Sequence, residues 1–338
     1  MQRPLERTRV IEVVAADAPL PVRLAIAMAG KIACELGAEV IILEPEGGDP
    51  LRALPPFLQG DGRRSALYAF LNGAKHIVRG QDPANLDAHA TRADALLTDV
   101  SVDIPRETTA VVVSIFGPHR SEMREPASEL TIMAMSGVLH LIGVQAGEPV
   151  RLPGHQPAYA AGLAAFLAMS AALLAPKRKI ADVCVLDALL WVNWKVVTEP
   201  LLKTPTGKAV NEWQVVEAAD GHVALVYMDR DWPALVDLVG DARLHAPHFA
   251  TRTNRLAHLD ELMAILRPWF VTRSKADIYR EAKQRGLPLG PVWSLSDLER
   301  DAHYLERDFW AATPMGIMPR LPAMWNGARP HASSLVWE

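Results

Sequence analysis

Residues 9–43, RVIEVVAADAPLPVRLAIAMAGKIACELGAEVIIL, decide the fold class. Two short runs rich in β-branched residues, Arg9–Val14 and Ala38–Leu43, flank an apolar helical stretch, Leu20–Leu36, which ends at Gly37. Two parallel strands need a crossover connection, and a helix supplies it. The order strand, helix, strand therefore predicts a parallel βαβ unit.

The same alternation continues through the first half of the chain. Four further runs have the length and composition of buried strands: His76–Val78, Ala95–Leu97, Thr109–Ile115 and Ile180–Val185. Strands that alternate with helices predict an α/β fold with a mostly parallel, doubly wound sheet of Rossmann type.

The pattern changes after Thr198–Lys208, a segment with two prolines and a glycine. Two strand-like runs follow, Trp213–Ala218 and His222–Tyr227, joined through an Asp-Gly pair that is typical of a hairpin. Helical stretches come next, which predicts a small α+β domain. The predicted organisation is a large domain over residues 1–197, a small domain over 209–293 and a C-terminal segment, 294–338, that returns to the large domain.

Composition excludes several classes of protein. The chain has 338 residues, half of them apolar, and a formal charge of −4, so no basic surface suited to nucleic acid is expected. Residues 157–175 are nearly uncharged, but they are rich in alanine, and we interpret them as a buried core helix rather than a membrane span. Two cysteines, Cys34 and Cys184, and no secretory segment predict a cytoplasmic location.

Local motifs do not identify a cofactor or a metal. The turn after the first strand, Ala15–Pro19, has no glycine, so the dinucleotide fingerprint is missing. His245 and His248 lie close together without a cysteine or carboxylate at ligand spacing, and no metal site is predicted. We expect no tightly bound cofactor.

Several motifs, in order along the chain, together carry a family resemblance. They include LGAEVIILEPEGGDPLR at 36–52, LNGAK at 71–75, SIFG at 114–117, AMSG at 134–137 and DAHYLER at 301–307. This series resembles the family III CoA transferases, the CaiB/BaiF group that contains formyl-CoA transferase and α-methylacyl-CoA racemase. The resemblance implies a Rossmann-like large domain, a small domain, CoA bound mainly on the large domain, and two chains threaded as interlocked rings.

The resemblance also implies a catalytic aspartate four residues before Gly162, where this chain has Ala158. In the family this aspartate attacks the acyl-CoA carbonyl, and a methyl group cannot do so. The nearest carboxylate upstream in the sequence is Glu148. His155 and Tyr159 are weak candidates for a role in the site, and a polar turn and packing are the competing interpretations.

The CoA site implied by the resemblance is incomplete. Lys75 and Arg52 keep their motif positions and are our CoA-binding candidates, as a point charge and a fork, although either residue could be an ordinary surface cation. Other positions have lost their family residues, namely Pro45, the loop Leu97–Ser101 and Phe116. CoA or an acyl-CoA is expected as substrate rather than as resident cofactor.

Three hypotheses follow from these departures. The leading one is a non-catalytic subunit of a heteromeric CoA transferase, paired with a homologue that contains the aspartate. The second is an enzyme that acts on acyl-CoA, as a CoA transferase or in a racemase-like or isomerase-like reaction, without an aspartyl-CoA intermediate. The third is a non-enzymatic pseudoenzyme that uses the fold as a homodimeric scaffold.

Overall fold

A computed structural model describes residues 3–58, 61–105, 108–117, 127–142, 148–194, 213–313 and 316–330. The chain forms two compact units, one from Met1–Thr206 with Glu306–Glu338 and the other from Gly207–Leu305. The predicted linker, Thr198–Lys208, lies outside the described residues.

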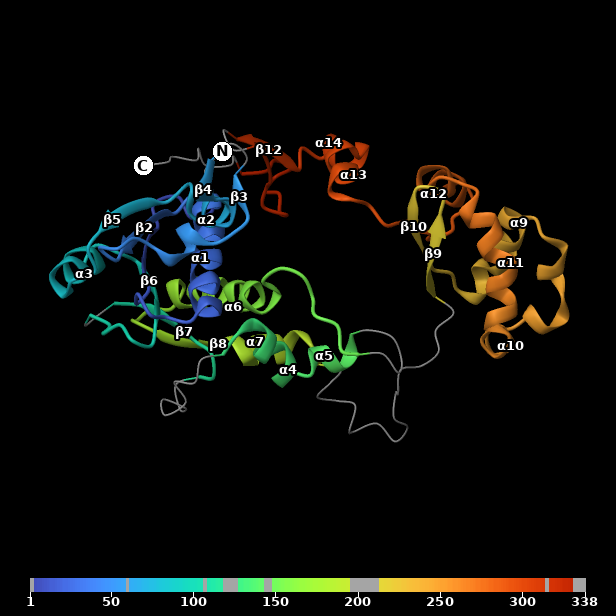
Figure 1. Cartoon of the computed structure of the whole chain (residues 1–338). Helices are drawn as coiled ribbons and strands as arrows, with labels where there is room; N and C mark the ends of the chain where they lie inside the picture. Colours follow the sequence, from blue (N-terminus) through green and yellow to red (C-terminus); the bar gives the residue numbers. More distant parts are fainter. Residues whose placement is uncertain are drawn as a thin grey trace. The chain divides into compact units, whose positions relative to one another are not determined.

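The first unit is built on a six-stranded parallel sheet (Figure 1). Its strand order is β5 (His76–Arg79), β2 (Glu39–Glu44), β1 (Arg9–Val13), β6 (Ala95–Asp99), β7 (Ala110–Ser114) and β8 (Ile180–Cys184). Strand β1 lies in the middle, because it pairs with β2 through Val10 and Val40 and with β6 through Val10 and Ala95. The predicted α/β class with a parallel sheet is confirmed.

Side chains of β1 alternate between the two faces of the sheet, as the pleat requires. Ile11 and Val13 pack on one face with α3 (Pro83–Ala90). Val10 packs on the other face, in the core that includes buried residues of α1 (Leu20–Glu35) and α6 (Gln156–Leu173). The intervening Glu12 is buried at 3% exposure and falls on the Val10 side by this alternation, so the sequence places a carboxylate in an otherwise apolar layer.

Helices α1 and α6 pack closely against each other. A Cβ atom on Gly162 would lie 2.7 Å from Met28 Cβ, so glycine is what permits this approach. By length and composition α6 is the one helix of the described chain that could cross a membrane. Its buried side faces α1, while Leu163 and Leu167 are exposed.

The first unit also contains short helices and strands outside the six-stranded sheet. They are η1 (Pro50–Ala53), β3 (Phe57–Leu58), β4 (Asp61–Ser65), α2 (Ala66–Asn72), α4 (Glu129–Met135), α5 (Val138–Leu141), α7 (Val185–Val192), β12 (Trp310–Thr313) and β13 (Gly316–Pro319).

The second unit has an antiparallel sheet of three strands, β11 (Gly290–Pro291), β10 (Gly221–Leu225) and β9 (Gln214–Ala218). Its helices are η4 (Asp229–Asp231), α9 (Trp232–Val239), η5 (Ala242–His245), η6 (Pro247–Phe249), α10 (Arg252–Ala257), α11 (Leu259–Val271), α12 (Lys275–Gln284) and α13 (Leu295–Arg300), while α14 (Ala302–Glu306) spans the boundary. Arg255 is fully buried in this core, where its guanidinium pairs with Asp229 and lies 4.7 Å from the ring centroid of Trp232.

Candidate functional site

The carboxyl ends of β1 and β6 mark the point where a doubly wound sheet usually binds a ligand. Here the chain's own side chains use the backbone groups at this edge. Asp99 accepts hydrogen bonds from the Ala15 and Ser101 amides, at 2.6 and 2.8 Å. Arg23 donates to the Ala15 carbonyl at 2.5 Å and pairs with Asp49 at 3.4 Å. An anion would have to displace Asp99 to reach the same amides.

This edge also differs from the sequence interpretation of Leu97–Ser101 as a loop. Residues 97–99 form the end of strand β6, and Asp99 is 2% exposed. The structure corrects the loop to begin at Val100. The end of the strand could not be predicted from apolar residues, because Thr98 and Asp99 are consecutive polar residues that are nevertheless buried.

Lys75, the first CoA-binding candidate, is buried inside the first unit. Its ammonium forms an ion pair with Glu12 Oε1 at 2.7 Å and donates to Ala27 O and Asn72 Oδ1, both at 2.8 Å. Burial raises the pKa of Glu12 to about 7 and lowers the pKa of Lys75, which opposes the effect of the ion pair in both groups. CoA binding by Lys75 stays a prediction, and a phosphate there would compete with Glu12.

Gly30 leaves the room that this ion pair occupies. A Cβ atom at Gly30 would lie 1.5 Å from Glu12 Oε1 and 3.2 Å from Lys75 Nζ. We expect Gly30→Ala to lower the free energy of unfolding by about 1–3 kcal/mol because it overpacks the site. This loss outweighs the gain of about 1 kcal/mol that alanine normally brings inside a helix.

Urea denaturation would measure the effect of Gly30→Ala. Gly47→Ala is the matched control, since a Cβ atom there meets no atom within 4 Å. A Gly30→Ala variant as stable as the wild type would contradict the placement of Glu12 against this helix.

Arg52, the second CoA-binding candidate, lies where η1 follows β2. Its guanidinium bonds both carboxylate oxygens of Glu44, at 2.7 and 3.2 Å, and lies 4.3 Å from the ring centroid of Tyr68. The Arg52 side chain is 33% exposed, so it is open to solvent on one side. Its role toward CoA also stays a prediction.

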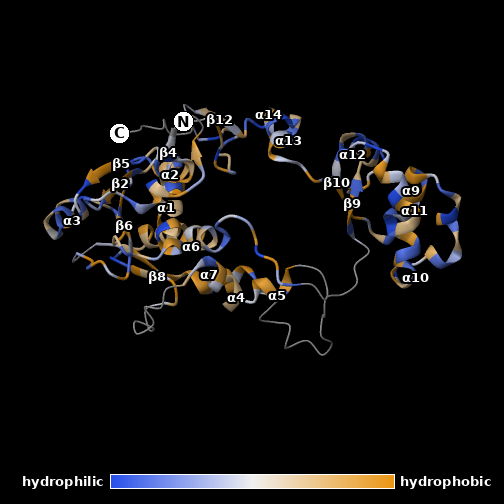
Figure 2. Cartoon of the chain, viewed as in Figure 1, coloured by the Kyte–Doolittle hydropathy of each residue, from blue (hydrophilic) through white to orange (hydrophobic). Residues whose placement is uncertain are grey.

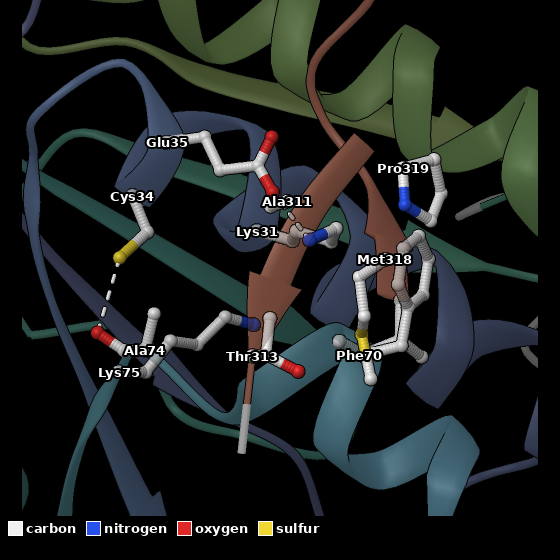
Figure 3. Close-up of a pocket in the computed structure, with 11 residues that line it drawn as sticks. Lys31, Cys34, Glu35, Phe70, Ala74, Lys75, Ala311, Thr313, Met318 and Pro319 are labelled. Atoms are coloured by element: carbon white, nitrogen blue, oxygen red, sulfur yellow. Dashed lines mark hydrogen bonds and ion pairs between the residues drawn. The ribbon is translucent and has the colours of Figure 1, made fainter. Parts of the chain in front are cut away.

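A small pocket lies beside Lys75, between α1, α2 and the C-terminal hairpin of β12 and β13 (Figure 3). Lys31 and Glu35 form an ion pair of 2.5 Å on its α1 side. Cys34 is buried and donates to the Ala74 carbonyl at 3.2 Å. Most of the wall is apolar and its charged groups are paired, so the pocket offers a ligand few polar partners.

Ala158 lies in the first turn of α6 and is completely buried. It belongs to an aliphatic and aromatic cluster that also contains Leu24, Leu71 and Tyr68. Its neighbour Tyr159 is partly buried against the same cluster. The position that the family resemblance gives to the nucleophile is therefore a packed methyl group.

A carboxylate that the sequence analysis missed lies near this turn. Glu129, in the first turn of α4, is hydrogen bonded through Oε2 to Nδ1 of His155, the residue that precedes α6. The Glu129 side chain is 7% exposed and that of His155 24% exposed. The rings of His155 and Tyr159 meet edge to face, with centroids 6.1 Å apart.

Sequence distance explains why Glu129 was overlooked. It precedes His155 by 26 residues, and the nearest carboxylate upstream in the sequence is Glu148. Packing of α4 against α6 brings Glu129 to the site. Among the described residues, no group of three His, Cys, Asp or Glu side chains could hold a metal ion.

Comparison with known proteins identifies the class to which this fold and its site region belong. The sequence profile of CoA-transferase family III matches residues 110–334, and the chain belongs to this family. The confirmed family agrees with the resemblance carried by the motifs.

Individual relatives are distant in sequence. Subunit BbsE of succinyl-CoA:(R)-benzylsuccinate CoA-transferase from Thauera aromatica is 24% identical, over 83% of this chain and 78% of its own. The alpha subunit of succinyl-CoA–L-malate CoA-transferase from Chloroflexus aurantiacus is also 24% identical, over 84% and 74%. A CAIB/BAIF family protein from Brucella suis has the same fold, with a TM-score of 0.87, 20% identity and coverage of 100% and 97%.

Proposed function

We propose that this chain is the non-catalytic subunit of a heteromeric family III CoA transferase. The observation that carries the proposal is Ala158, a buried methyl group at the position that the resemblance assigns to the aspartate nucleophile. Lys75 and Arg52 are both engaged by carboxylates of the chain itself, which further argues against a self-sufficient transferase.

Two other observations support a partner subunit. BbsE and the malate CoA-transferase alpha chain are both named as subunits, so heteromers occur among the relatives. The first unit also exposes a set of apolar side chains on α6, on α7 and just after α7, and the ribbons of both helices are coloured mainly as hydrophobic in Figure 2. The members of this set are large side chains at least half exposed in the single chain: Leu163, Leu167, Trp191, Val192 and Trp194. A monomer rarely leaves such a patch uncovered.

The partner in this proposal is a homologue that contains the aspartate, and the two chains form the interlocked dimer of the family in the cytoplasm. The partner supplies the nucleophile, while this chain completes the dimer and one wall of the acyl site. The alternative, an enzyme acting on acyl-CoA without an aspartyl-CoA intermediate, is favoured by one observation, the contact between Glu129 and His155.

Co-expression of this chain with an aspartate-containing homologue from the same genome tests the proposal. We expect the two chains to co-purify and to transfer CoA from succinyl-CoA to a carboxylic acid, with each chain alone inactive in transfer. Alanine in place of the partner's aspartate should abolish transfer without separating the chains. A stable homodimer of this chain that does not bind the homologue would refute the proposal.

A further inference from the structure

Glu129 and His155 form a polar contact between two helices of the first unit. Glu129 is the first residue of α4, and its side chain is buried. Its Oε2 atom bonds His155 Nδ1, whereas Oε1 has no hydrogen-bond partner among the described residues. A buried carboxylate oxygen without a partner is costly, and a catalytic role is one of the reasons for which such a group is found in a native protein.

The geometry of the contact fixes the state of the imidazole. A carboxylate accepts a hydrogen bond from Nδ1–H, so a neutral His155 keeps its lone pair on Nε2. His155 also directly precedes the first turn of the 18-residue helix α6. A carboxylate that orients an imidazole in this tautomer is the arrangement of a general base and its orienting group.

General-base catalysis needs a nucleophile near the first turn of α6 from which His155 can remove a proton. Ala158 offers none. Tyr159 is a poor nucleophile, because burial and then the charge of Glu129 raise the pKa of its phenol. Water is the remaining nucleophile for a thioester held at the partly exposed His155.

We propose that His155 and Glu129 give this chain an acyl-CoA hydrolase activity of its own, with His155 as general base and Glu129 as positioning residue. The inference rests on the proposed function for one point, the placement of the thioester at the first turn of α6. It goes further in assigning the chain a reaction that needs no aspartate.

The step balances without any other reactant. Water oxygen bonds to the thioester carbonyl carbon while His155 Nε2 takes one water proton. The carbon–sulfur bond then breaks, and the departing thiolate takes that proton from the imidazolium. The products are a carboxylic acid and CoA thiol, and His155 returns to its starting form.

Release of CoA thiol from acetyl-CoA and succinyl-CoA, followed with a thiol reagent, tests the proposal on the full chain. General-base catalysis contributes about 10²–10⁴-fold, so His155→Ala should lose at least about 10²-fold in kcat. Imidazole in the buffer should restore part of this loss above a protein-free blank. Glu129→Gln should lower kcat with little change in KM, since it keeps a hydrogen bond but loses the charge.

Two controls separate catalysis from folding. His140→Gln changes an exposed histidine on the neighbouring helix α5 and should leave thiol release unchanged. Circular dichroism and Tm of every variant report whether it folds, and His155→Gln serves where His155→Ala does not. Thiol release by the wild type no faster than by folded His155→Ala or His155→Gln would overturn the inference.

Failure of this inference can be told apart from failure of the proposed function. Titration calorimetry with CoA measures binding, and co-purification measures association with the aspartate-containing homologue. An active complex in which this chain alone releases no thiol overturns the hydrolase and leaves the subunit proposal intact. Thiol release by a chain that does not associate with the homologue would overturn the subunit proposal and leave the hydrolase intact.

Discussion

Replacing Lys75 with methionine is expected to lower the free energy of unfolding by about 3–5 kcal/mol, because it leaves the Glu12 carboxylate buried without its cation. Glu12 is 3% exposed and Lys75 is its ion-pair partner at 2.7 Å. The loss should be greater at pH 8 than at pH 5. An acid whose folded pKa is raised contributes stability at low pH and loses it as the pH rises, and an unpaired Glu12 is such an acid.

Chemical denaturation of Lys75→Met at both pH values measures this effect. Lys31→Met is the matched control, since Lys31 pairs with Glu35 four residues along the same helix and such pairs contribute less than about 1 kcal/mol. The double variant Glu12→Gln/Lys75→Met should recover much of the lost stability, because it removes both charges. If Lys75→Met were no less stable than the control, Lys75 would be a surface cation after all.

Placing aspartate at Ala158 is the second large change. We expect Ala158→Asp to lose about 3 kcal/mol or more in the free energy of unfolding, since it puts a carboxyl group among Leu24, Leu71 and Tyr68. Burial should also raise the pKa of the new carboxyl. Thermal and urea unfolding give the stability, and succinyl-CoA-dependent transfer gives the activity.

Ala171→Asp is the control on the exposed face of the same helix, with an expected cost of about 1 kcal/mol or less. We expect no transfer activity from Ala158→Asp alone, because Arg52 and Lys75 remain bound to Glu44 and Glu12. Transferase activity in this single variant would contradict the expectation that the pairing of Arg52 and Lys75 with carboxylates of the chain prevents transfer. Unchanged stability would contradict the packing of Ala158.

Much of the fold could be predicted from the sequence. The run from Arg9 to Leu43 forms β1, α1 and β2 with ends within one residue of those predicted, because apolar periodicity and Gly37 act locally. The strand ending at Asp99 was predicted too short, since its last two residues are buried polar groups, and Asp99 bonds the amide of Ala15, which is 84 residues away in the sequence.

The candidate site, like the fold, could be predicted from the sequence only in part. Ala158 and Gly162 could be placed on one helix from their spacing and from the family resemblance. The ion-pair partner of Lys75 could not be predicted from the sequence. Glu12 lies on strand β1, and the two side chains come together only in the folded structure, in the space that Gly30 leaves open. Glu129 was equally hidden, since it lies 26 residues before His155 and on another helix.

The sequence by itself determined the order of strands and helices and the family, and it predicted the missing aspartate, because each of these depends on residues that are neighbours in the sequence. Tertiary structure alone decided which charges pair. Burial removes water from an ionisable group, so its partner must come from whatever element packs nearby, however distant in the chain. For this protein, tertiary packing paired Lys75, which remains a predicted phosphate contact, with the buried Glu12, and joined His155 to Glu129.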